Sequence, residues 1–162
     1  MKRISCLLLT LIFIASLLAA PANAEEIADN RDIVGSLQTF EDGSYIIIGV
    51  PKISIIPMAR SNSVSFSAEM PARFINSSNE IEWEYFLTAT FSYVYGVSAT
   101  CTNASYSYTI YDDSWKFSDG STSRSGATAY GYGTFKNKFL FVTTKTVEID
   151  LSMTCDVYGN LS

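Results

Sequence analysis

The sequence predicts an all-β domain, an antiparallel two-sheet β-sandwich of about seven or eight strands with jelly-roll or Greek-key-like wiring. Between Ile81 and Cys101 every odd position is apolar or aromatic, and seven of the ten even positions are Glu, Ser or Thr. A second run, from Phe139 to Val157, shows the same alternation. A period of two is typical of strands with one buried face, and several such runs separated by turn residues favour a sandwich.

Residues 1–24 are predicted to be a secretory signal peptide. Two basic residues precede an apolar segment from Ile4 to Leu18, and Pro21–Ala24 supplies a small-residue cleavage pattern. The alternative, an N-terminal membrane anchor, is disfavoured because the apolar run is short for a membrane span. The mature chain would begin at Glu25, and we expect it to be secreted, extracellular and without a stable membrane span.

The mature chain divides into a lead-in and one domain. Residues 25–43 are acidic and weakly patterned, and we expect either a short helix or a flexible segment there. The sandwich is expected to occupy residues 44–162, a length that can bury a sizeable core. Its first part, Ser44–Met58, is β-branched and apolar but contains Pro51, which has no N–H to donate to a β-ladder. This pattern predicts one edge strand kinked at Pro51, or two strands that meet at a corner.

The long alternating runs must bend or divide. A strand from Ile81 to Cys101 would be about 70 Å long, roughly twice the diameter of a domain of this size. Gly96 is the expected break, where a bulge would carry the chain from one sheet to the other. Residues 102–104 are predicted to form a turn because the alternation changes phase beyond them, and residues 136–138 are predicted to form another. Polar residues on the apolar face of the last run place its expected bend at 143–145.

The composition argues against several classes of partner. Without the signal peptide, nine Lys and Arg residues face sixteen Asp and Glu residues, a net charge of about −7. An acidic chain without a basic cluster argues against nucleic acid and against anionic membrane surfaces. The chain contains no histidine, which removes Ser-His-Asp and Cys-His catalytic systems and His-ligated metal sites. We therefore expect neither a cofactor nor a metal.

Carboxylates remain as candidate chemistry. Glycoside hydrolysis needs only two of them, and Glu82 and Glu84 face the same way about 7 Å apart on a predicted strand. Because they lie on the polar phase, a solvated strand face is the favoured interpretation, and no catalytic residue is assigned. Asp112, Asp113 and Asp119 flank a short loop and could supply oxygens to calcium, although the capping of turns is the commoner role of Asp in such loops.

Two cysteines remain in the mature chain, Cys101 and Cys155, and both lie on the apolar phase of predicted strands. An even count in an exported chain predicts a disulfide between them. Closing a loop of about 55 residues would stabilise the fold by roughly 4 kcal/mol in the chain-entropy model. The alternative is a pair of buried free thiols.

Aromatic side chains are the best candidates for ligand contacts, because amphipathic rings on a sheet face offer sugars or proteins a large rigid area with a polar tip. Tyr111 and Trp115, beside the polar loop predicted at residues 118–123, are the predicted ligand-binding residues. For any single tyrosine, the favoured interpretation is a core residue or a cross-strand pair. The clustered tyrosines are Tyr106, Tyr108, Tyr111, Tyr130 and Tyr132.

Together these features predict a secreted bacterial β-sandwich that acts as a non-enzymatic extracellular binding or surface-interaction module with a glycan or protein ligand. Two alternatives stay open: a small glycan hydrolase that uses carboxylates alone, and a membrane-active protein that inserts a β-hairpin such as Ser98–Tyr111. No motif identifies a characterised family. As a whole, the mature chain is similar to small secreted β-proteins of Gram-positive bacteria, a resemblance that implies no site residue.

Overall fold

The computed structural model describes residues 35–60 and 62–162. This part of the chain is all-β, with nine antiparallel strands in two sheets and no helix. The predicted fold class is confirmed, with at least one strand more than expected. The predicted signal peptide, residues 1–24, lies outside the described residues. The strands are β1 (Ser36–Thr39), β2 (Tyr45–Ile48), β3 (Lys52–Arg60), β4 (Ser63–Ile75), β5 (Ile81–Val94), β6 (Ser98–Ile110), β7 (Trp115–Ser125), β8 (Thr128–Phe139) and β9 (Val142–Thr154).

Part of the predicted lead-in, residues 25–43, contributes the first strand. β1 pairs antiparallel with β2, with Ser36 opposite Ile48. The N–H of Gly35 also donates to the carbonyl oxygen of Ile48 (2.7 Å). The described end of the lead-in is therefore neither a helix nor separate from the domain, because its backbone extends the edge of the larger sheet.

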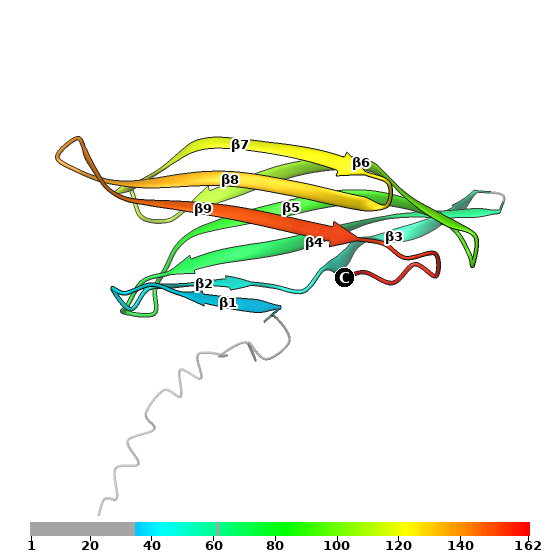
Figure 1. The fold of residues 1–162 in the computed structure, drawn as a ribbon, viewed down its shortest axis with the longest axis horizontal. Helices are drawn as coiled ribbons and strands as arrows, with labels where there is room; N and C mark the ends of the chain where they lie inside the picture. The colour runs from blue at the N-terminus through cyan, green and yellow to red at the C-terminus, as the bar shows by residue number, and fades with distance from the viewer. Residues whose placement is uncertain (1–34, 61) are drawn as a thin grey trace, which may run out of the picture.

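Two sheets face each other across the core (Figure 1). The larger sheet has the order β1-β2-β4-β5-β6, with β3 also paired to β4, and the smaller has the order β7-β8-β9. Among the described residues, every pair of neighbouring strands is consecutive in sequence except β2 and β4. The sheets are therefore meanders, and the expected jelly-roll or Greek-key wiring is corrected. Tight turns cause this, because a tight turn returns the chain to the adjacent place in the same sheet.

The strands β2 and β3 lie one after the other along the same edge of β4. β2 pairs with the end of β4, from Ala72 to Ile75, and β3 pairs with its beginning, from Ser63 to Glu69. Pro51 lies between them, where a residue without an N–H interrupts the ladder. The predicted break at Pro51 is confirmed, but β2 is not an edge strand because β1 pairs with its other side.

The run from Ile81 to Cys101 folds as a hairpin within one sheet and does not pass between the sheets. Gly96 lies in the turn between β5 and β6 with a φ of 69°, which glycine adopts without steric cost. Residues 102–104, expected to form a turn, belong to β6. A register shift beside Thr90 leaves Thr102 as an extra residue in a β-bulge. A bulge changes the phase of the alternation as a turn would, which explains the wrong prediction.

The last hairpin turns at two apolar residues. Leu140 and Phe141 connect β8 to β9 with φ values of 46° and 69°. Residues 136–138, expected to form a turn, belong to β8, and residues 143–145, expected to form a bend, belong to β9. Both predictions are wrong because Gly, Asn, Asp and Pro are the usual turn signals, and none of them occupies this turn.

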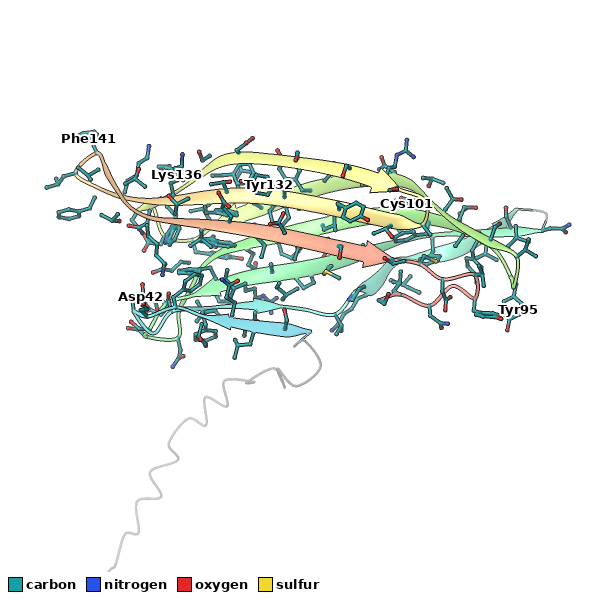
Figure 2. All side chains as sticks on the ribbon, viewed as in Figure 1. Asp42, Tyr95, Cys101, Tyr132, Lys136 and Phe141 are labelled. Carbon is teal, nitrogen blue, oxygen red and sulfur yellow. The ribbon has the colours of Figure 1, made fainter. Side chains whose placement is uncertain are left out.

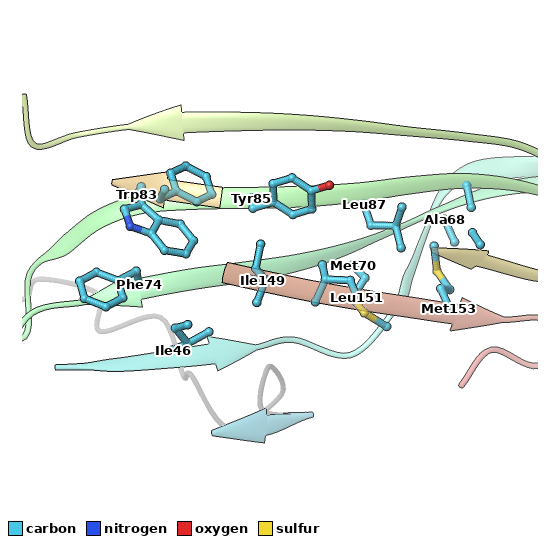
Figure 3. Close-up of a cluster of buried hydrophobic side chains, with 14 of the residues drawn as sticks. Ile46, Ala68, Met70, Phe74, Trp83, Tyr85, Leu87, Ile149, Leu151 and Met153 are labelled. Atoms are coloured by element: carbon cyan, nitrogen blue, oxygen red, sulfur yellow. The ribbon is translucent and has the colours of Figure 1, made fainter. Parts of the chain in front are cut away.

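Aromatic rings, among them Phe74, Trp83 and Tyr85, gather toward one end of the core (Figure 3). Trp83 of β5 is fully buried and stacks on Phe135 of β8, with 3.8 Å between ring centroids. Tyr85 is also fully buried, and its hydroxyl donates to the carbonyl oxygen of Tyr132 (3.0 Å) in the opposite sheet. Most odd positions of the long run face inward as predicted, whereas Ile81, Tyr95 and Val97, at its start and in its turn, are exposed. The buried ones are Trp83, Tyr85, Leu87, Ala89, Phe91 and Cys101.

Cys101 and Cys155 are free, buried thiols, so the predicted disulfide is not formed in the structure. Each thiol instead donates to a nearby backbone carbonyl, Cys101 to that of Asn103 (3.2 Å) and Cys155 to that of Asp156 (3.3 Å). The two residues still meet at one place, because their N–H groups donate to consecutive residues of the β7–β8 turn. Both side chains face inward as predicted, but the predicted bond between them is absent.

We expect both thiols to be unreactive in the folded protein and to react after unfolding. Burial raises the pKa of the Cys155 thiol to about 11 and also raises that of Cys101, so little reactive thiolate exists near neutral pH. Mass spectrometry after alkylation with iodoacetamide should show both cysteines unlabelled in the native protein and labelled in denaturant. Labelling that requires a reductant would show that a disulfide joins them instead.

Candidate functional site

Trp115, predicted to meet a ligand at the surface, lies in the core. Its side chain is 1% exposed, and its ring packs on Phe74 with 4.9 Å between centroids. The indole Nε1–H donates to Oε2 of Glu82 (2.6 Å). Residues 118–123, expected to form a polar loop after it, belong to β7. Trp115 therefore offers no exposed ring to a ligand.

Tyr111, the other predicted ligand-binding residue, is 57% exposed. Its hydroxyl donates to Oε2 of Glu84 (2.6 Å), and this hydrogen bond raises the pKa of the phenol. Nε of Arg73 donates to the other oxygen of the same carboxylate (2.5 Å). The ring of Tyr111 is accessible, but its polar end is held by the protein.

Glu82 and Glu84 do not share a cleft. A register shift at the start of β5 makes Glu82 the extra residue of a β-bulge, and bulges redirect side chains. Glu82 accepts hydrogen bonds from Nε1 of Trp115 and from Nδ2 of Asn76 (3.2 Å), whereas Glu84 keeps the two partners described above. The pair that a carboxylate-only hydrolase would need is thus divided between two networks.

A pocket of about 410 Å³ lies at the end of the sandwich where Figure 2 labels Asp42. Nζ of Lys145 donates to Oδ2 of Asp42 (2.7 Å) and to Oγ of Ser44 (2.6 Å), and it lies 4.3 Å from the centroid of the Phe40 ring. The hydrogen bond from Lys145 holds the pKa of Asp42 well below its usual range. The polar groups of this pocket, like Glu82, already form hydrogen bonds within the protein. We therefore interpret the pocket primarily as a structural network.

A second hollow, of about 470 Å³, crosses the outer face of the three-stranded sheet. All three strands contribute to it, and two tyrosines of the central strand lie at its middle. Its lining has no Lys or Arg and one carboxylate. We call it the tyrosine groove, and its lining residues are Ser121, Ser123, Tyr130, Gly131, Tyr132, Asp150, Leu151 and Ser152.

The strand register gives each tyrosine of the groove a polar neighbour on both sides. On β7 each tyrosine is opposite an exposed serine. On β9 Tyr132 is opposite Asp150, and Tyr130 is opposite Ser152. Hydroxyl and carboxylate oxygens therefore flank two rings that lie two residues apart on one strand, about 7 Å along it.

The two rings are held differently. The hydroxyl of Thr134, the next outward-facing residue of β8, donates to the Tyr132 hydroxyl (2.7 Å) and fixes that ring on the sheet. Tyr130 is 44% exposed, and its hydroxyl has no hydrogen-bond partner among residues 35–60 and 62–162. Figure 2 shows Tyr132 on β8, well away from the labelled ends of the sandwich. The groove thus combines one fixed ring with one free ring.

Gly and Tyr alternate in β8 from Tyr130 to Gly133, a pattern that allows aromatic rings to pack over bare backbone. The structure shows which ring does so. A Cβ on Gly133 would lie 2.9 Å from Cε2 of Tyr85, and one on Gly131 would lie 3.1 Å from its hydroxyl oxygen. Tyr85 fills the inner side of β8, so Tyr130 and Tyr132 face outward. The serines and the aspartate beside them could not be assigned without the strand register.

No family model matches the chain, and comparisons with curated proteins and with solved structures find no match. No helix in the described part of the chain is long and apolar enough to cross a membrane. The same residues contain no group of three His, Cys, Asp or Glu side chains placed to hold a metal ion. Of the aspartates considered for calcium, Asp112 and Asp119 accept hydrogen bonds from the backbone N–H groups of Ser114 and Gly120 (2.8 Å each).

Proposed function

We propose that the protein is a non-enzymatic extracellular module that binds a glycan chain in the tyrosine groove. The observation that carries the proposal is the pair of outward-facing rings, Tyr130 and Tyr132, flanked on both neighbouring strands by exposed hydroxyl and carboxylate groups. A sugar has an apolar ring face and a rim of hydroxyls. The groove offers tyrosine rings for the apolar face of the sugar and hydroxyl and carboxylate groups for its hydroxyls.

Each part of the groove has a role in such binding. The tyrosine rings pack on the apolar faces of sugar rings at a low entropic cost, because an aromatic side chain has few torsions to fix. The carboxylate of Asp150 and the serine hydroxyls accept hydrogen bonds from the sugar. Since the groove spans all three strands of the sheet, it suits the interior of a chain better than a terminal sugar.

The charge of this face indicates the class of glycan. Asp150 lies in the groove, and in the next row of the sheet Asp119 and Glu148 flank Thr134. Three carboxylates without a cation in the groove lining repel uronic acids and sulfated sugars. We therefore propose neutral polysaccharides as the ligand class.

We expect Tyr130→Ala to weaken binding to a neutral polysaccharide at least about tenfold, because the ring supplies about 1.4 kcal/mol or more of contact. Affinity electrophoresis through gels that contain neutral or acidic polysaccharides, followed by calorimetry on those that retard the protein, measures this. The protein is expressed from the full chain, and far-ultraviolet circular dichroism confirms that each variant is folded.

Tyr111→Ala is the matched control, because Tyr111 is more exposed than Tyr130 but lies outside the groove. Binding that is lost in Tyr111→Ala and kept in Tyr130→Ala would contradict the groove proposal. So would a folded protein that binds no neutral polysaccharide. The same samples are assayed for new reducing ends, which a hydrolase would release and a binding module would not.

A further inference from the structure

The turn between β8 and β9 exposes four consecutive apolar side chains, Phe139–Val142, which we call the apolar tip. Their exposed fractions run from 64% for Val142 to 101% for Phe141. Figure 2 shows Phe141 at the extreme end of the molecule, beyond the body of the sandwich. A contiguous exposed apolar patch at a protruding point is typical of an interaction site.

The backbone of the tip does not account for its residues. Leu140 and Phe141 both have positive φ, 46° and 69°, which is costly for side chains of this size. A two-residue hairpin turn with positive φ at both positions is usually Asn-Gly. The tip therefore has residues that lower both stability and solubility, and a contact outside the folded chain would explain them.

Lysines surround the base of the tip in a chain that is otherwise acidic. Lys116 and Lys136 are directly opposite each other on β7 and β8, and Lys138 is next to the tip. Like charges placed opposite in a sheet are destabilising. Within residues 35–60 and 62–162, no carboxylate forms an ion pair with any of the three. We call Lys116, Lys136 and Lys138 the lysine collar.

We propose that the apolar tip inserts into the surface of an anionic lipid bilayer while the lysine collar contacts the headgroups. The tip offers roughly 500 Å² of apolar surface, less than the ~800 Å² per partner of a stable protein interface. A bilayer needs no complementary pocket, and it accepts a protruding apolar point with basic residues behind it.

The net charge of the chain by itself argued against anionic membranes. Near a bilayer, however, the charge of the lysine collar has more effect than the net charge of the whole chain. The negative potential of such a surface falls off within about 10 Å at 0.1 M salt, so only the groups nearest the bilayer interact with it strongly. Asp113, in the neighbouring β6–β7 loop, and Asp119, on β7, are the exposed carboxylates closest in sequence to the collar, each three residues from Lys116. The tyrosine groove lies on the outer face of the three-stranded sheet, so insertion of the tip at the end of the sandwich leaves the groove open.

The decisive variant is Leu140→Asn/Phe141→Gly. It removes the two central apolar side chains and supplies the residues that a turn with positive φ prefers. We expect this variant to melt at the same temperature as the parent or higher, and to lose vesicle binding at least about tenfold, so that misfolding cannot explain the loss.

Co-sedimentation of the protein with phosphatidylcholine vesicles, with and without phosphatidylglycerol, measures binding. We expect binding to the anionic vesicles at low salt, weakening in high salt, and little binding to phosphatidylcholine alone. Lys136→Glu/Lys138→Glu should lose the preference for anionic vesicles. The matched control is Tyr95→Ser/Val97→Ser, which removes two apolar residues that are 73% and 74% exposed in the β5–β6 turn and should bind like the parent. Figure 2 shows Tyr95 at the opposite end of the molecule from Phe141.

Each other result overturns the proposal. Absence of binding to anionic vesicles, or equal binding by the parent and Leu140→Asn/Phe141→Gly, would do so directly. Binding lost in the Tyr95→Ser/Val97→Ser control would place the contact at the other end. A parent protein that forms dimers without lipid, while Leu140→Asn/Phe141→Gly is monomeric, would show that a second copy of the chain covers the tip.

Discussion

Trp83→Ala is expected to lower the free energy of unfolding by about 4 kcal/mol. The indole is fully buried, and it stacks against Phe135 and Phe74 with 3.8 Å and 5.4 Å between ring centroids. These rings belong to both sheets, so the substitution opens a cavity between the layers that neither sheet can close without moving. Unfolding in guanidinium chloride, followed by circular dichroism, measures the change.

Trp83→Phe is the control for this prediction. The Nε1–H of Trp83 is buried and has no hydrogen-bond partner within the described residues, so replacing the indole by a phenyl ring removes an unsatisfied donor while keeping a stacked ring. We expect a smaller loss, about 1 to 2 kcal/mol. Equal losses for the Ala and Phe variants would contradict the view that ring packing at this position joins the two sheets.

The fold class could be predicted because alternation is a local property of the chain. A strand with one buried face must place apolar side chains at every second residue, and Trp83, Tyr85 and Leu87 are all fully buried as that rule requires. Pro51 was informative for the same reason, since a missing N–H interrupts a ladder whatever the strand pairs with. Predictions of this kind depend only on the residue and its immediate neighbours.

The wrong predictions share a different cause. Thr102 and Glu82 are extra residues of β-bulges, and a bulge depends on the pairing of two strands and not on one of them. The turn at Leu140 and Phe141 lacks any turn residue, so the sequence placed the bend elsewhere. Trp115 lies beside a polar segment, yet its side chain is enclosed because β7 begins there and faces the larger sheet.

The groove could be predicted only in part. Tyr130 and Tyr132 were recognisable as members of a tyrosine cluster, but the sequence analysis favoured core or cross-strand packing for each of them. The choice is made by Tyr85, which comes from the opposite sheet and occupies the space beside the glycines of β8. Long-range contacts of this kind are outside the reach of periodicity, and they decide which face of β8 meets solvent.

Gly133→Val is expected to lower the free energy of unfolding by about 3 kcal/mol and to impair glycan binding as well. A Cβ at this position would lie 2.9 Å from Cε2 of Tyr85 and 3.2 Å from Cγ2 of Ile149, so β8 must move outward or Tyr85 must leave its position. Either movement strains the hydrogen bond from the Tyr85 hydroxyl to the carbonyl oxygen of Tyr132. Chemical denaturation and the polysaccharide binding assay together measure both effects.

A double-mutant cycle separates the clash from other consequences of losing a glycine. Tyr85→Ala alone should cost about 4 kcal/mol, because it removes a fully buried ring. With that ring gone, the two closest contacts of the added Cβ are removed and only Ile149 stays near it, so the double variant should be less destabilised than the two single effects added together, by about 1 kcal/mol or more. Additive losses would mean that Gly133 is not needed to accommodate Tyr85. In that case the outward orientation of Tyr130 and Tyr132 would need another cause. We attribute it to Tyr85, whose side chain occupies the inner face of β8 and leaves only the outer face for the two rings of the groove.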